Sequence, residues 1–175
     1  MTRYAALIAF LLSTLATGCV SQTSTRTQAA EPGVRFILVR HAEKATDDPK
    51  DPTLSEAGMV RAKRLAASLA DARVVAAYAT QYRRTQLTAA PTSMSHHLDL
   101  QTYNASIPAF EFARQLRDAH RTGTVLVVGH SNTIPALAAV LCACEVAPMR
   151  EDEFDRRIEI RVATDGSARM DVQRD

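Results

Sequence analysis

Two arginines and two histidines in this chain follow short apolar runs, where their side chains could act together. They are Arg40, His41, Arg84 and His130. Guanidinium groups pair with phosphate oxygens through two parallel hydrogen bonds, and charge-assisted bonds of this kind are strong. Neighbouring cations should also lower the pKa of a histidine below its usual value of about 6.5, so that the ring stays neutral at neutral pH. A neutral imidazole can accept a phosphoryl group, and His41 is therefore our candidate nucleophile.

The apolar runs that precede these residues predict buried strands. They cover residues 34–39, 74–79 and 124–128. Continuous apolar runs are typical of parallel strands that are buried on both faces. Ligands of open α/β sheets bind at the carboxyl ends of such strands, so the three strands should bring the four side chains to one edge. A single arginine or histidine at a strand end is more often an ordinary loop residue, and the agreement of three strands is what favours a site.

Helical patterns alternate with these strands. Helices are expected at residues 56–69, 87–90 and 108–119, and from residue 133 onward. Pro91 should end the second of them, because proline cannot donate a backbone hydrogen bond. Residues 158–172 alternate around a turn, which predicts a hairpin. The predicted fold is a three-layer αβα fold of the α/β class, with a mainly parallel central sheet and an antiparallel hairpin at its C-terminal edge.

The composition argues against several other functions. The formal net charge of +2 is too small to indicate a nucleic-acid partner. Cys142 and Cys144 lack the further ligands of a zinc site; two small buried thiols are favoured, and a disulfide stays open. The adjacent His96 and His97 would point to opposite faces of a strand, so they form a poor chelate. We therefore expect no metal and no other cofactor.

The first 33 residues are expected to lie outside the folded domain. Residues 1–18 combine a short basic start with an apolar run, which is typical of a signal peptide. Small residues then precede Cys19, and this arrangement resembles a bacterial lipobox, which implies that Cys19 carries a lipid; ordinary secretory cleavage is the alternative. Residues 19–33 are predicted to form a lipidated flexible tether, and residues 34–175 the domain.

A lipid anchor would hold the protein on a membrane of the bacterial cell envelope, facing the periplasm. Val20 stands after the cysteine where an aspartate would be a retention signal for the inner membrane. By resemblance to known sorting signals, this position favours the outer membrane.

Four segments resemble motifs of the histidine phosphatase superfamily, which has the phosphoglycerate mutase-like fold. They are residues 40–43, 78–89 and 126–132, together with 54–62, which fits the first helix of the family. The resemblance covers residues 34–163 and implies that His41 is the phosphorylated nucleophile. The residues implied to hold the phosphoryl group are Arg40, Arg84 and His130, and His130 is also implied in catalysis. A compact, metal-independent phosphomonoesterase that acts through a phosphohistidine intermediate is therefore expected.

The general acid that protonates the leaving group has no clear counterpart in the sequence. Acid-phosphatase members carry an aspartate directly after the second histidine, where this chain has Ser131. Glu43 is the nearest carboxylate in sequence to His41 and is our candidate acid, whereas Glu111 fits a helix surface better. Compact members that dephosphorylate phosphohistidine manage without an obvious acid. The alternative function is a non-catalytic envelope lipoprotein that binds a phosphate ligand.

An exported location would exclude substrates that occur only in the cytosol. A mutase is disfavoured, because glycolytic substrates are cytosolic. The expected partners are a small phosphorylated substrate or a phosphorylated component of the envelope, and the membrane through the lipid anchor. Nothing in the sequence selects one substrate among these.

Overall fold

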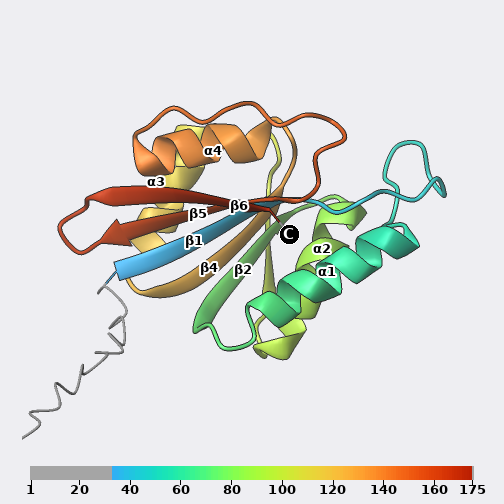
Figure 1. The fold of residues 1–175 in the computed structure, drawn as a ribbon, viewed down its shortest axis with the longest axis horizontal. Coiled ribbons are helices and arrows are strands. Elements are labelled where there is room, and N and C mark those ends of the chain that lie inside the picture. Colours follow the sequence, from blue (N-terminus) through green and yellow to red (C-terminus); the bar gives the residue numbers. More distant parts are fainter. Residues whose placement is uncertain (1–32, 175) are drawn as a thin grey trace, which may run out of the picture.

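The computed structural model describes residues 33–174. The predicted signal peptide, Cys19 and nearly all of the predicted tether lie outside the described residues. The described chain forms six strands and four helices (Figure 1). The strands are β1 (Gly33–Arg40), β2 (Val74–Thr80), β3 (Leu100–Tyr103), β4 (Gly123–Gly129), β5 (Arg156–Ala163) and β6 (Ala168–Arg174). The helices are α1 (Glu56–Ser68), α2 (Arg83–Ser95), α3 (Ala109–Ala119) and α4 (Thr133–Cys142).

All six strands form one sheet in the order β3-β2-β4-β1-β5-β6. The first four strands in this order pair in parallel. β5 runs antiparallel to β1, and β6 runs antiparallel to β5. This arrangement confirms the predicted fold class, including the antiparallel hairpin at the C-terminal edge.

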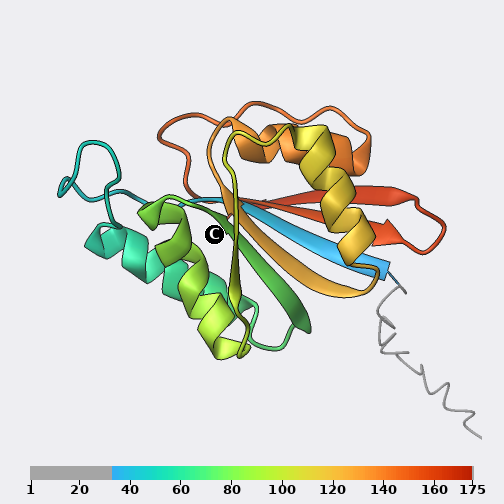
Figure 2. The ribbon, with the colours of Figure 1, turned by 180° about the vertical axis from the view of Figure 1, so that it is seen from behind.

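The helices cover both faces of the sheet, α1 and α2 on one face and α3 and α4 on the other (Figures 1 and 2). β1 is buried on both faces, as its continuous apolar sequence predicts. Its side chains alternate: Phe36 and Leu38 pack in the core beneath α3 and α4. Ile37 and Val39 pack on the opposite face with residues of α1 and α2.

The expectation that Pro91 ends the second helix is wrong. α2 continues through Pro91 to Ser95. The last turn is held by burial, since Thr92 and Ser93 are both buried. The hydroxyl of Ser93 also donates a hydrogen bond to the carbonyl oxygen of Leu98, at 2.6 Å. Tertiary contacts of this turn therefore outweigh the one backbone hydrogen bond that proline cannot donate.

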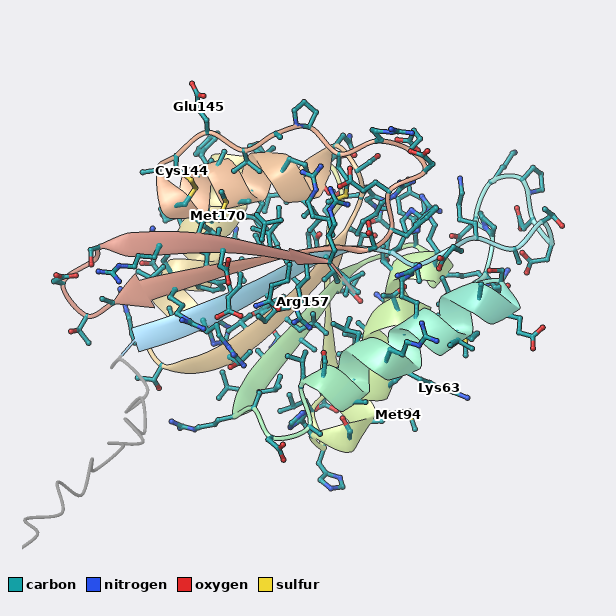
Figure 3. The ribbon with its side chains drawn as sticks, in the orientation of Figure 1. Lys63, Met94, Cys144, Glu145, Arg157 and Met170 are labelled. Atoms are coloured by element: carbon teal, nitrogen blue, oxygen red, sulfur yellow. A yellow bond between two sulfur atoms is a disulfide. The ribbon has the colours of Figure 1, made fainter. Side chains whose placement is uncertain are left out.

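The preference for two free thiols at the end of α4 is also wrong, because Cys142 and Cys144 form a disulfide. Ala143 between them adopts a left-handed conformation, with φ of 52°. This turn brings the two Cα atoms to 5.1 Å, a separation that a disulfide can span. Cys144 lies beside Met170 of β6, with 4.0 Å between the two sulfur atoms (Figure 3).

The segment 143–155 connects α4 to β5. It runs back along α4 toward the carboxyl ends of the parallel strands (Figure 1). No helix within residues 33–174 is both long enough and apolar enough to cross a bilayer.

Candidate functional site

The four residues singled out in the sequence lie around one hollow at the carboxyl ends of β1, β2 and β4. Arg40 is the last residue of β1, and His41 follows it. His130 directly follows β4, and Arg84 lies in the first turn of α2, just after β2. The hollow has a volume of about 370 Å³. Its other lining residues are Lys44, Tyr82, Ala105, Ser106, Ser131, Asn132, Thr133 and Glu151.

The ring of His41 is held in one tautomer. Its Nδ1 lies 2.7 Å from the carbonyl oxygen of Ala42. A carbonyl oxygen can only accept, so Nδ1 carries the proton and Nε2 keeps its electron pair. The backbone nitrogen of His41 donates to the carbonyl oxygen of Gly129 at 2.9 Å, which ties the residue to the end of β4.

His41 is neutral at neutral pH. Only 3% of the residue is exposed. Burial lowers its pKa to about 3, the positive charge of Arg40 acts in the same direction, and the hydrogen bond to Ala42 opposes both. The electron pair on Nε2 is therefore available over the whole physiological range of pH.

His130 stands opposite, with its ring centroid 5.5 Å from that of His41. Its Nε2 lies 3.1 Å from the hydroxyl oxygen of Thr80, the last residue of β2. Burial, together with the positive charges of Arg84 and Arg40, lowers the pKa of His130 to about 4. A bound dianion would counter these cations and raise this pKa, so that the ring could donate a hydrogen bond to it.

Arg40 is buried and joins β1 to the segment 143–155. Its Nη1 donates to the carbonyl oxygens of Arg150 and Glu151, at 2.9 and 2.7 Å. Its Nη2 donates to Oε2 of Glu151 at 3.0 Å. Its guanidinium carbon lies 4.3 Å from the ring centroid of Phe154. These contacts fix the guanidinium in place at the inner wall of the hollow.

Arg84 approaches the same hollow from α2. Its guanidinium carbon lies 4.4 Å from the ring centroid of Tyr82, and its Nη1 lies 3.6 Å from Oδ1 of Asp51. The Nε groups of both Arg40 and Arg84 are buried, and neither has an acceptor among the described residues. A buried donor without an acceptor is costly, and an oxyanion in the hollow is the kind of ligand that supplies acceptors.

Glu43, the predicted acid, does not line this hollow. Its carboxylate pairs with Arg61 of α1, with 2.6 Å between Oε1 and Nη2 and 3.1 Å between Oε2 and Nε. The hydrogen bonds from Arg61 lower the pKa of Glu43, which favours the ionised form. Glu43 and Arg61 line a separate hollow along α1. The acid role of Glu43 stays a prediction, and this ion pair argues against it.

The carboxylate that does line the hollow belongs to Glu151, which sequence reasoning missed. Glu151 stands in the charged run 150–153, which is typical of a solvated surface. No local pattern links it to Ser131, twenty residues earlier, whose hydroxyl donates to Oε1 of Glu151 at 2.5 Å. Within residues 33–174, no group of three or more His, Cys, Asp or Glu side chains is placed to hold a metal ion.

Part of the sequence is similar to a known enzyme family. A model of the histidine phosphatase superfamily (branch 1) matches residues 36–105. No curated protein matches the sequence. The matched residues include Arg40, His41 and Arg84, three of the residues that line the hollow.

Several solved structures share this fold, and this chain aligns with almost the whole length of each of them. The protein histidine phosphatase SixA, complexed with tungstate, is 16% identical with a TM-score of 0.63, over 80% of this chain and 96% of that one. Mycobacterial glucosyl-3-phosphoglycerate phosphatase is 15% identical with a TM-score of 0.65, over 81% and 99%. A phosphoserine phosphatase from Entamoeba histolytica is 13% identical with a TM-score of 0.59, over 78% and 94%. Identities this low show a shared fold.

Proposed function

We propose that this protein is a metal-independent phosphohydrolase that cleaves phosphomonoesters through a phosphohistidine intermediate on His41. The observation that carries the proposal is the 2.7 Å hydrogen bond between Nδ1 of His41 and the carbonyl oxygen of Ala42. It leaves a neutral Nε2 with an available electron pair, in a hollow that two arginines also line. The family match over residues 36–105 supports the same function.

In the first step, Nε2 of His41 attacks the phosphorus atom of the ester. The bond from phosphorus to the ester oxygen breaks, and its electron pair leaves with that oxygen, which then takes a proton from water. The imidazole gains positive charge as the bond from nitrogen to phosphorus forms. The carbonyl oxygen of Ala42 stabilises this charge through the proton on Nδ1, while Arg40 and Arg84 offset the charge of the phosphoryl oxygens.

In the second step, a water molecule attacks the phosphorus atom of phosphohistidine. The bond from phosphorus to nitrogen breaks, and its electron pair returns to Nε2. Inorganic phosphate leaves, and the neutral ring of His41 is restored in its original tautomer. The low pKa of His41 favours this return, because the free ring does not keep an extra proton.

The substrate class proposed is a small phosphorylated molecule or a phosphorylated component of the envelope. The related structures are named as phosphatases of protein histidine, glucosyl-3-phosphoglycerate and phosphoserine. These substrates share only the phosphoryl group, which fits a site whose recognition elements are concentrated on that group.

The test is turnover of p-nitrophenyl phosphate by the full chain in mild detergent, measured between about pH 5 and pH 8. We expect release of nitrophenolate by the wild type and none above background by His41→Ala. Labelled phosphate should be trapped on His41 after quenching in alkali, where phosphohistidine survives. Binding of phosphate without turnover would support the alternative, a non-catalytic phosphate-binding lipoprotein.

We further propose that the protein is exported and anchored to the envelope through a lipid on Cys19. The support is the sequence of residues 1–19, in which a basic start and an apolar run precede small residues and the cysteine. The proposed phosphatase would then act on substrates outside the cytosol.

A further inference from the structure

We infer that Glu151 is the general base that activates the water molecule in the hydrolysis of phosphohistidine. The inference rests on the proposed phosphohistidine route. Among the described residues that line the hollow with His41, Glu151 is the one that carries a carboxylate. Asp51 also approaches an arginine of the site, but it accepts a hydrogen bond from the backbone nitrogen of Arg83 and does not line the hollow.

The carboxylate of Glu151 is held at both oxygens. Oε1 accepts a hydrogen bond from the hydroxyl of Ser131 at 2.5 Å, and Oε2 accepts one from Nη2 of Arg40 at 3.0 Å. The backbone carbonyl of Glu151 also accepts from Nη1 of Arg40, at 2.7 Å. Although the side chain is largely exposed, its position is therefore set by two residues that follow neighbouring strands.

The charge state of Glu151 suits a base. The hydrogen bond from Ser131 is the main cause that lowers its pKa, and the positive charges of Arg40 and Lys44 act in the same direction. Its negative charge in turn slightly raises the pKa of His130. Glu151 is thus ionised at neutral pH, and a carboxylate can take a proton from water as the water attacks.

The difference in burial between His41 and Glu151 is consistent with in-line attack of water on phosphohistidine. His41 lies at the floor of the hollow and is 3% exposed, whereas the side chain of Glu151 is 81% exposed. A phosphoryl group on Nε2 of His41 would therefore have the imidazole behind it and solvent in front. Water must arrive opposite to the nitrogen that leaves, and Glu151 is an exposed carboxylate of the same hollow that such a water molecule can reach from solvent.

The water oxygen forms a bond to phosphorus, and one water proton passes to a carboxylate oxygen of Glu151. The bond from phosphorus to Nε2 breaks, and its electron pair returns to the ring. Glu151 then releases its proton to solvent, and phosphate leaves the two arginines.

Pre-steady-state kinetics of Glu151→Gln with p-nitrophenyl phosphate test this role. We expect a burst of nitrophenolate close to one equivalent per chain, because the first step does not need the base. Steady-state turnover should then be about 100-fold slower than in the wild type, in the range typical of general base catalysis. Phosphohistidine trapped in alkali should accumulate to the same one equivalent.

Asp152→Asn is the matched control. It removes the same charge from the next residue, whose carboxylate is exposed and pairs with Arg150. We expect wild-type burst and steady-state rates. Glu145→Gln is a second control on the same segment, because Glu145 points away from the body of the protein (Figure 3).

Ser131→Ala tests whether Ser131 positions and tunes this base. Loss of its hydrogen bond should raise the pKa of Glu151, since that bond is the main cause of the lowered value. The rate of phosphohistidine hydrolysis falls as pH drops through the pKa of the base. In Ser131→Ala this fall should therefore begin at a higher pH, a change that a purely structural role would not produce.

Four results would distinguish the ways in which these proposals can fail. Absence of wild-type turnover and of trapped phosphohistidine would overturn the proposed function itself. Normal turnover by Glu151→Gln would overturn only the role of Glu151. Faster turnover with a lower KM would show instead that Glu151 competes with phosphate for Arg40, and equal loss of both steps in a folded variant would show that it only supports Arg40.

Discussion

The hydroxyl oxygen of Thr80, the last residue of β2, lies 3.1 Å from Nε2 of His130, the residue that follows β4. The same hydroxyl lies 2.8 Å from the hydroxyl of Thr85 in the first turn of α2. Thr80 is fully buried, so this contact excludes water. A parallel pair of strands thus sets the orientation of a site histidine through one hydroxyl group.

Thr80→Val should misplace His130 without altering the volume of the core. We expect a loss of about 1–3 kcal/mol in the free energy of unfolding, since buried polar partners are left unsatisfied. Phosphatase activity should fall at least about tenfold, which corresponds to about 1.4 kcal/mol in the transition state. Thr80→Ser keeps the hydroxyl and should retain most of the activity; equal activity of the two variants would contradict the role of the hydrogen bond.

The lowered pKa values of His41 and His130, about 3 and about 4, predict how stability depends on pH. Between these values and about 6.5, the unfolded state binds more protons than the folded state, so stability falls as pH falls. Between about pH 6.5 and pH 5 each histidine should account for a loss of about 1.6 kcal/mol. Urea unfolding at the two pH values measures the change.

The double variant His41→Gln, His130→Asn is the control for this pH dependence. Its stability should change much less between the same two pH values, because the two groups that titrate differently in the folded and unfolded states are gone. An unchanged slope would assign the effect to other groups, such as His120, whose pKa burial also lowers.

Glu43→Gln distinguishes a structural role of Glu43 from the acid role predicted from the sequence. The ion pair with Arg61 ties the chain after β1 to α1, and both side chains are partly buried. We expect a loss of about 1 kcal/mol in the free energy of unfolding, measured by urea denaturation. Turnover of a phosphomonoester with a poor leaving group should stay within about twofold of the wild type, whereas loss of a general acid would cost about 100-fold or more.

Cys19→Ser tests the proposed lipid anchor. Removal of the thiol leaves no atom for a thioether-linked lipid, and each buried methylene of such chains contributes about 0.8 kcal/mol to membrane binding. The variant should move from the membrane to the soluble fraction after cell lysis. Substitution of Ser21, two residues further on, should leave the protein with the membrane; equal fractionation of both variants would reject lipidation.

Most of the fold could be predicted because the parallel strands of the core are visible in the sequence as short apolar runs. The run before His130 is apolar throughout and the run before Arg40 is apolar except for Arg35, as in strands buried on both faces, and strand ends in such sheets converge. The prediction that Pro91 ends the second helix was wrong because the loss of one backbone hydrogen bond is small beside the burial of the turn that follows it. Glu151 escaped prediction because its partners, Arg40 and Ser131, are set by the tertiary fold and not by any spacing along the chain.

Because Cys142 and Cys144 form a disulfide, the oxidation state of these two cysteines indicates the compartment in which the protein folded. Disulfides persist in the periplasm and at cell surfaces, while cytosolic reductants keep thiols reduced. In the peptide that holds Cys142 and Cys144, an exported chain and a copy retained in the cytosol should therefore differ by two hydrogen atoms. Mass spectrometry of that peptide, released from the protein of each cell fraction without a reductant, measures the difference without any assay of activity.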